Sequence, residues 1–183
     1  MEIIDRLLNA RCLRKKISDN RDRLYGVALS WSGEPAVADD LVQETLMIAL
    51  QRIHQLREEE RLNAWMYTIL SNCWKQYLRR VRPTVDIDDV EICCDGDAEA
   101  GCSEQEVVDH VRHAILRLPA GQRQTVTLVD LAGFSYAEVA DILDIPIGTV
   151  MSRLYTSRQS LQKVLANFRT TQPVSRGHLR RVK

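Results

Sequence analysis

The sequence has no apolar run long enough to cross a membrane. A membrane-spanning helix needs about 20 consecutive apolar residues, and charged residues interrupt every apolar stretch of this chain, including the opening MEIIDRLLNARCLRKK. That opening also lacks the pattern of a secretion signal. We therefore expect a cytoplasmic protein.

Glycine, proline and phenylalanine are also scarce, with 8 Gly, 5 Pro and 2 Phe among 183 residues. This composition argues against an all-β sandwich and favours helices. The five cysteines form an odd set without the spacing of a disulfide framework, which is typical of reduced thiols. The sequence shows no Ser/His/Asp set, carboxylate pair or phosphate-binding glycine loop, so we predict no enzyme, no catalytic residue, no metal and no cofactor.

Lysine and arginine are absent between Pro83 and Val111, and ten acidic residues lie in that stretch. The whole chain has 25 acidic and 25 basic residues, so its net charge of zero hides two cationic flanks around an acidic middle. Cationic flanks are typical of a nucleic-acid binder, because they attract phosphates.

Apolar residues recur at helical spacing through most of the chain. One stripe predicts a long helix over about 37–56, and its members are Leu41, Thr45, Ala49, Ile53 and Leu56. Residues 83–102 show no helical period and read as a linker. We therefore predict an all-α fold of two small helical domains, 1–82 and 103–169, joined by an acidic flexible linker at 83–102 and followed by a basic tail at 170–183.

The stretch SYAEVADILDIPIGTVMSRLYTSRQSL, residues 135–161, has the pattern of a helix-turn-helix. SYAE is a capping box that starts one helix, DIPIG is a turn, and Val150, Leu154, Leu161 and Leu165 form the core stripe of a longer helix. Hydroxyl, amide and guanidinium groups lie across from that stripe, and these groups read base edges and hold phosphates.

Two other helical faces leave alternatives open. Four of the eight Trp and Tyr residues lie within 62–80, where they either form a platform for unstacked bases or fill the core. The face of the 37–56 helix that carries Asp40, Gln43 and Glu44 is either a solvated surface or a docking surface.

Three segments together resemble the extracytoplasmic-function subfamily of bacterial sigma factors. They are ADDLVQETLMIAL (38–50), LNAWMYTILSNCWKQYLRR (62–80) and LRLPAGQRQTVTLVDLAGFSYAEVADILDIPIGTVMSRLYTSR (116–158). The resemblance implies a sigma-2 domain, a sigma-4 domain, and a linker that runs through the RNA path of the polymerase. It also implies three partners: core RNA polymerase, contacted at the β′ clamp helices and the β flap; promoter DNA; and an anti-sigma factor, which could hold the protein at the membrane.

Site residues follow from the same resemblance. Polymerase contact falls on Asp40, Gln43 and Glu44. Contact with the minus-ten element falls on Arg57, Arg61, Asn63, Tyr67, Asn72 and Lys75, whereas Trp65 is expected to pack the domain. In the minus-thirty-five reader, Met151, Ser152, Tyr155 and Thr156 face bases, Arg153 and Arg158 face the DNA backbone or support the helix, and Ser135 and Tyr136 hold a phosphate at a helix N-terminus.

The chain departs from this family in charge. Thr156 stands where the family usually has arginine, Met151 and Thr68 stand where a basic residue is common, and Leu50 stands where tryptophan is common. We therefore predict weak DNA binding by the free protein, because phosphate contacts supply much of DNA affinity. Two alternatives stay open: a stand-alone helix-turn-helix regulator, and a sigma factor with an added metal or redox sensor built from Cys93, Cys94, Cys102, His110 and His113.

Overall fold

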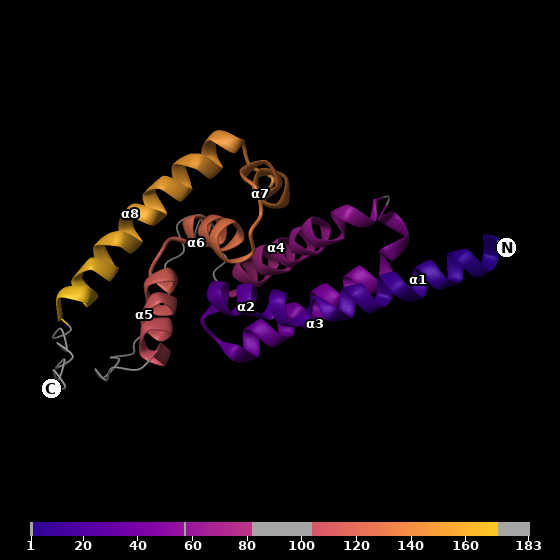
Figure 1. Cartoon of the computed structure of the whole chain (residues 1–183), viewed down its shortest axis with the longest axis horizontal. Helices are drawn as coiled ribbons and strands as arrows, with labels where there is room; N and C mark the ends of the chain where they lie inside the picture. The colour runs from indigo at the N-terminus through magenta and orange to yellow at the C-terminus, as the bar shows by residue number, and fades with distance from the viewer. Residues whose placement is uncertain (1, 57, 82–103, 172–183) are drawn as a thin grey trace, which may run out of the picture.

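The computed structural model describes residues 2–56, 58–81 and 104–171, and every regular element in those ranges is helical (Figure 1). This confirms the predicted all-α class. The helices are α1 Glu2–Asp19, α2 Arg21–Ser32, α3 Pro35–Gln51, α4 Leu62–Val81, α5 Glu104–Leu116, α6 Ala120–Val126, α7 Tyr136–Leu143 and α8 Ile147–Thr171. Short 3₁₀ turns occupy Ile53–Gln55 and Glu59–Arg61, and a π-helical segment, Thr127–Leu131, continues α6. None of these helices is both long and apolar enough to cross a membrane.

Glycine and proline set the boundary between α2 and α3. Gly33 adopts a left-handed backbone, with φ of 75°, and its N–H donates to the Leu29 carbonyl at 2.9 Å, which closes α2. Pro35 then begins α3, where its missing N–H costs nothing. The predicted extension of α3 to residue 56 is wrong: the helix ends at Gln51, and the chain turns through the 3₁₀ segment instead.

Helices α1 to α4, which we call the first unit, surround a core of large apolar side chains. Trp31, Leu70 and Trp74 are almost fully buried there, and Trp74 stacks on Tyr77 with ring centroids 5.5 Å apart. Trp65 is half-buried against the same cluster, as expected. The aromatic side chains of α4 therefore serve mainly as core.

Helices α5 to α8, the second unit, are organised around a buried arginine. Arg123 on α6 is fully buried and donates to the carbonyls of Leu116 and Leu118, at 2.6 and 2.8 Å, so it holds the turn between α5 and α6. The apolar stripes predicted for α7 and α8 face inward, with Val139, Leu143, Val150 and Leu154 buried.

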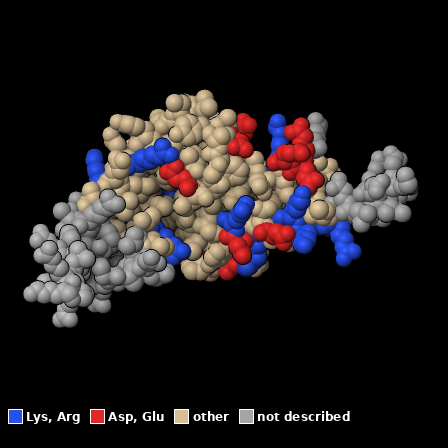
Figure 2. Space-filling view, in the orientation of Figure 1, with Lys and Arg blue, Asp and Glu red and all other residues tan. Residues whose placement is uncertain are grey.

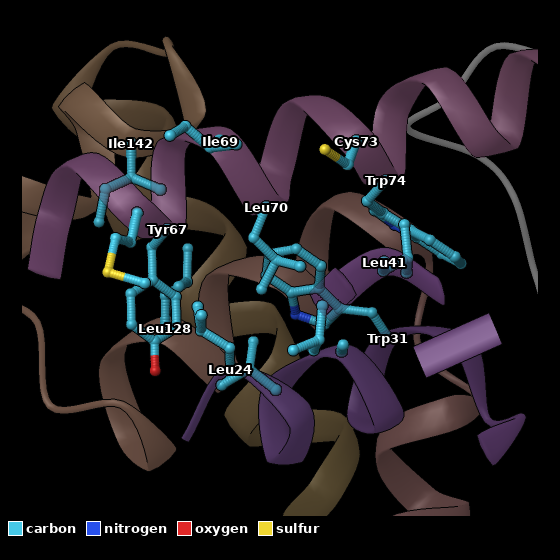
Figure 3. Packing of buried hydrophobic residues seen from close by; sticks show 14 of the residues in the cluster. Leu24, Trp31, Leu41, Tyr67, Ile69, Leu70, Cys73, Trp74, Leu128 and Ile142 are labelled. Carbon is cyan, nitrogen blue, oxygen red and sulfur yellow. The ribbon is translucent and has the colours of Figure 1, made fainter. Parts of the chain in front are cut away.

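The two units pack directly against each other. One hydrophobic cluster contains Leu24 and Tyr67 of the first unit together with Leu128 and Ile142 of the second, and Figure 3 shows these side chains side by side. The structure thus joins the two predicted domains through a shared cluster, and Leu118, Val126 and Leu154 form a smaller cluster within the second unit. The predicted linker, residues 83–102, lies outside the described residues, as do residues 172–183 of the predicted tail, whereas Thr170 and Thr171 end α8.

Candidate nucleic-acid and polymerase interfaces

Helix α7, its turn and α8 form a helix-turn-helix with well-defined caps. The Glu138 N–H donates to Ser135 Oγ at 3.3 Å, and the Ser135 N–H donates back to Glu138 Oε2 at 2.8 Å, which is the predicted capping box. At the other end of α7, Asp144 adopts a left-handed backbone with φ of 57°, and the Ile145 N–H donates to the Ala140 carbonyl. These caps fix the angle at which α8 leaves the turn.

The outer face of α8 presents the predicted base contacts to solvent. Met151 and Tyr155 are 55% and 68% exposed. The hydroxyls of Ser152 and Thr156 donate to carbonyls one turn back, at 3.0 Å each, so each oxygen still has capacity to accept from a base amino group. An α-helix with this face open fits the major groove.

Arg153 and Arg158, the two arginines of α8 predicted to face the DNA backbone or support the helix, are less open to solvent than Met151 and Tyr155 or are held in an ion pair. Arg158 makes two hydrogen bonds to Asp130, at 2.6 and 3.3 Å, and this pairing, with a smaller contribution from Tyr136, raises the pKa of Arg158. Arg153 is half-buried. In this geometry Arg158 ties α8 to the π-helical segment through Asp130.

The N-terminus of α7 already holds a negative group. Glu138 accepts from both the Ser135 N–H and the Ser135 hydroxyl, and these bonds lower the pKa of the Glu138 carboxyl. The Ser135 N–H is therefore occupied in this structure, whereas Tyr136 remains exposed beside it. A phosphate at this end would have to approach the Glu138 carboxylate.

Two of the predicted minus-ten contacts on α4 are covered by the second unit. Tyr67 is only 4% exposed and meets Phe134 edge-on, with ring centroids 4.9 Å apart and planes at 74°. Its burial raises the pKa of the Tyr67 hydroxyl. Lys75 Nζ donates to the carbonyl of Leu143, the last residue of α7, at 2.9 Å. Both side chains are thus engaged by the second unit in this structure.

Three of the other predicted minus-ten residues are solvent-exposed. Asn63 lies at the start of α4, Asn72 lies midway along it, and Arg61 precedes it in an ion pair with Glu58 at 2.6 Å. Such an exposed pair contributes little and leaves the guanidinium available. Arg57 lies outside the described residues.

The outer face of α3 carries the predicted polymerase contacts. Asp40 and Gln43 are exposed and Glu44 is half-buried. Two large apolar side chains, Met47 and Leu50, are also exposed on α3. Exposed apolar groups beside carboxylates are typical of a protein-docking surface, and the sequence analysis did not assign Leu50 to the predicted polymerase contact.

A groove of about 1500 Å³ separates the two units on one side. The first unit lines it with Asn63 and Tyr67, and the second unit with Phe134 and Ile142. Figure 2 shows acidic and basic side chains mingled over the part of the visible face toward α1. The shared hydrophobic cluster makes the contact between the units largely apolar.

The structure adds no support for the sensor alternative. Cys93, Cys94 and Cys102 lie outside the described residues, while His110 and His113 lie half-buried on α5. Across the described part of the chain, no group of three or more His, Cys, Asp or Glu side chains could hold a metal ion.

The helix-turn-helix and the separate helical unit on which it packs belong to one class of protein, the sigma-70 class of transcription initiation factors, as two family models show. Two family models match in this order: Sigma-70 region 2 over residues 17–84, and Sigma-70, region 4 over residues 109–161. A stand-alone helix-turn-helix regulator does not predict the first match.

The relatives of this chain within that class include sigma factors of the ECF group. The ECF RNA polymerase sigma factor EcfG of Rhodopseudomonas palustris is 35% identical over 142 residues, which cover 78% of each protein. The ECF sigma factor SigM of Mycobacterium tuberculosis is 31% identical over 81% of this chain and 74% of its own. The sigma factor RpoE of Bartonella quintana, solved in complex with the anti-sigma factor NepR, is 30% identical, with a TM-score of 0.65 over 83% of this chain and 95% of its own. The chain belongs to the ECF RNA polymerase sigma factors.

Proposed function

We propose that this sigma factor joins core RNA polymerase through the outer face of α3 and directs initiation at promoters read by two units. Helix α8 reads the minus-thirty-five element in the major groove, and α4 with the segment before it binds the minus-ten element. The observation that carries the proposal is the exposed reading face of α8, built on a capped helix-turn-helix.

The proposal assigns a non-catalytic role, because binding energy alone recruits polymerase and stabilises unstacked promoter bases. We place the functional domains at 1–82 and 103–169, with 83–102 as the connecting linker and 170–183 as a basic tail. The Bartonella relative, solved with its anti-sigma factor, supports regulation by such a partner here. We infer action in the cytoplasm, or at the membrane when an anti-sigma factor holds the protein there.

The test is run-off transcription with core polymerase, genomic DNA and this protein, followed by sequencing of the transcript starts. We expect a discrete set of starts that share two elements upstream. Starts that match those of core polymerase alone would contradict the proposal.

Two variants locate the polymerase contact. Replacing the exposed α3 side chains, Asp40→Asn with Gln43→Ala, should weaken core binding about tenfold, since a few central interface residues carry most binding energy. Asp19→Asn, which removes an exposed carboxylate on α1, is the matched control and should bind like the wild type.

A further inference from the structure

The exposed face of α8 carries three hydroxyl groups that differ in the direction of their hydrogen bonds. The Ser152 and Thr156 hydroxyls donate to carbonyls of their own helix, so their oxygens face solvent as acceptors. The Tyr155 hydroxyl instead accepts, because the side-chain amide Nε2 of Gln159 donates to its oxygen at 2.9 Å. Among the bonds that the structure gives Tyr155, none uses the hydroxyl proton, so that proton can be offered outward.

Gln159 lies on the same side of α8 as the predicted base contacts. Met151, Tyr155 and Gln159 are spaced four residues apart, so their side chains follow one row along the helix, and all three are exposed. Helix α8 runs along one edge of the molecule (Figure 1). Tyr155 is 68% exposed, so core packing does not fix its ring. The bond from Gln159 therefore restrains the phenol on the open side of the helix.

The direction of this bond decides which base edge Tyr155 matches. In the major groove guanine and thymine present the acceptors O6 and O4, whereas cytosine presents the donor N4 amino group. An unrestrained phenol can turn its proton aside and accept from an amino group, which removes the distinction. The Gln159 amide occupies the acceptor side of the oxygen, so the phenol meets DNA as a donor.

We propose that Gln159 is a positioning residue for base reading, which holds Tyr155 as a donor so that α8 prefers guanine or thymine to cytosine at one base of the minus-thirty-five element. The inference rests on the proposed function and adds a determinant of its specificity. Ser152 and Thr156, as acceptors, match amino groups at neighbouring base pairs. Because Gln159 acts through Tyr155, its removal matters only while the phenol is present.

The test measures sequence preference on duplex DNA with the full chain. Duplexes are selected from a random-sequence pool at low salt, where phosphate attraction is strongest. The affinity of the enriched duplex is then compared with that of each single base-pair change in it. We expect Tyr155→Phe, which removes only the hydroxyl, to reduce the preference at one base pair about fivefold. Gln159→Ala should reduce the preference at the same base pair, and the double variant should lose no more than Tyr155→Phe alone.

A second variant reverses the polarity of the bond. The carboxylate of Gln159→Glu can only accept, so it takes the phenol proton and withdraws the donor from DNA. Gln162→Glu is the matched control, because it adds the same charge at an exposed glutamine of α8 that has no bond to Tyr155 in the structure. Gln159→Glu should abolish the preference at the Tyr155 base pair, and Gln162→Glu should leave that preference intact.

Three results would overturn the inference: no enriched sequence with the wild-type protein, a loss in Tyr155→Phe that is the same for every duplex, or a preference that survives in Gln159→Glu. A uniform loss would show that Tyr155 holds a phosphate. Run-off transcription with core polymerase tests the proposed function separately. Absence of transcription with the wild-type protein would overturn that function, while the duplex preferences would still report on Tyr155 and Gln159.

Discussion

Helices α4 and α8 carry most of the predicted minus-ten and minus-thirty-five contacts, and the two helices differ in what covers those contacts. On α8, Met151 and Tyr155 project into solvent. On α4, Tyr67 is buried under Phe134 and Lys75 is bonded to the end of α7. The predicted base contacts on α8 are therefore exposed to solvent, whereas two of the predicted contacts on α4 are covered by the second unit.

The difference arises because α7 packs against both α4 and α8. Its buried Val139 and Ile142 lie in the hydrophobic cluster that also contains Tyr67 of α4 and Val150 of α8. A helix that supports one reader therefore covers the other. We therefore expect substitutions that weaken the packing of α7 to change the exposure of Tyr67 and Lys75 on α4 more than they change the shape of α8.

The largest effect is expected at Arg123, which joins both units. Arg123→Met leaves three buried carbonyls, those of Trp31, Leu116 and Leu118, without this donor. We expect the free energy of unfolding to fall by at least about 3 kcal/mol, because buried charge-assisted hydrogen bonds are costly to lose. Urea denaturation measures this change.

Arg117→Met is the control for Arg123. It removes a guanidinium from an exposed position two residues before Pro119 and should change stability by less than about 0.5 kcal/mol. Equal losses for the two variants would show that Arg123 does not organise the contact between units.

The second prediction concerns DNA binding by the exposed face of α8. Thr156→Arg adds a cation to the exposed face of α8, next to the exposed Tyr155. One more neutralised phosphate steepens the salt dependence of binding by about 0.9 in the slope of log affinity against log salt. Titration of a minus-thirty-five duplex at several salt concentrations measures that slope.

Gln162→Arg adds the same charge six residues further along α8, about 120° around the helix from Thr156. It should leave the slope nearly unchanged. The same increase for both variants would mean that general charge, rather than the face of α8, decides DNA contact.

Local signals in the sequence were sufficient for most of the fold. The SYAE box predicts the start of α7, and the bonds between Ser135 and Glu138 confirm it. The glycine before Pro35 marks the boundary of α3. These features depend on residues within one turn of each other, so their spacing determines the structure directly.

The contact by which the second unit covers Tyr67 and Lys75 on α4 could not be predicted from the spacing of residues in the sequence. The indole N–H of Trp31 donates to Thr127 Oγ1, 96 positions along the chain, and Lys75 donates to the Leu143 carbonyl, 68 positions along. Neither pair belongs to a motif, and α4 shows the same apolar and basic pattern whether its outer face meets DNA or α7. Only the packed structure distinguishes these two uses of the same residues.

The third prediction concerns the N-cap of α7, the helix that packs over part of α4. Ser135→Ala removes the N-cap and should cost about 1 kcal/mol at neutral pH. Because the pKa of Glu138 is lowered in the folded state, its carboxylate stabilises that state at pH values above the usual pKa of 4.5. This contribution disappears as the pH falls through the lower pKa of the folded state. The gap between wild type and variant should therefore narrow in acid.

Urea unfolding at pH 7 and pH 3.5 measures that gap. Ser18→Ala on α1 is the control, because Ser18 bonds only a carbonyl of its own helix among its described contacts and has no cap role. A gap that stays constant with pH would contradict the contribution of the Glu138 carboxylate.

The smallest effect is expected at the C-terminal end of α7, where the substitution should tighten the contact between α7 and α4. Asp144 has φ of 57°, a conformation that costs an L-residue energy and costs glycine none, although glycine also loses more entropy on folding. Asp144→Gly should therefore stabilise the protein by about 0.5 kcal/mol, whereas Asp141→Gly, within α7 at an exposed position, should destabilise it by a similar amount. Because Lys75 bonds the neighbouring Leu143 carbonyl, the firmer helix end should also slow the acetylation of Lys75 by acetic anhydride about twofold, which mass spectrometry measures. Faster acetylation in Asp144→Gly would mean that α7 does not hold the cover over α4.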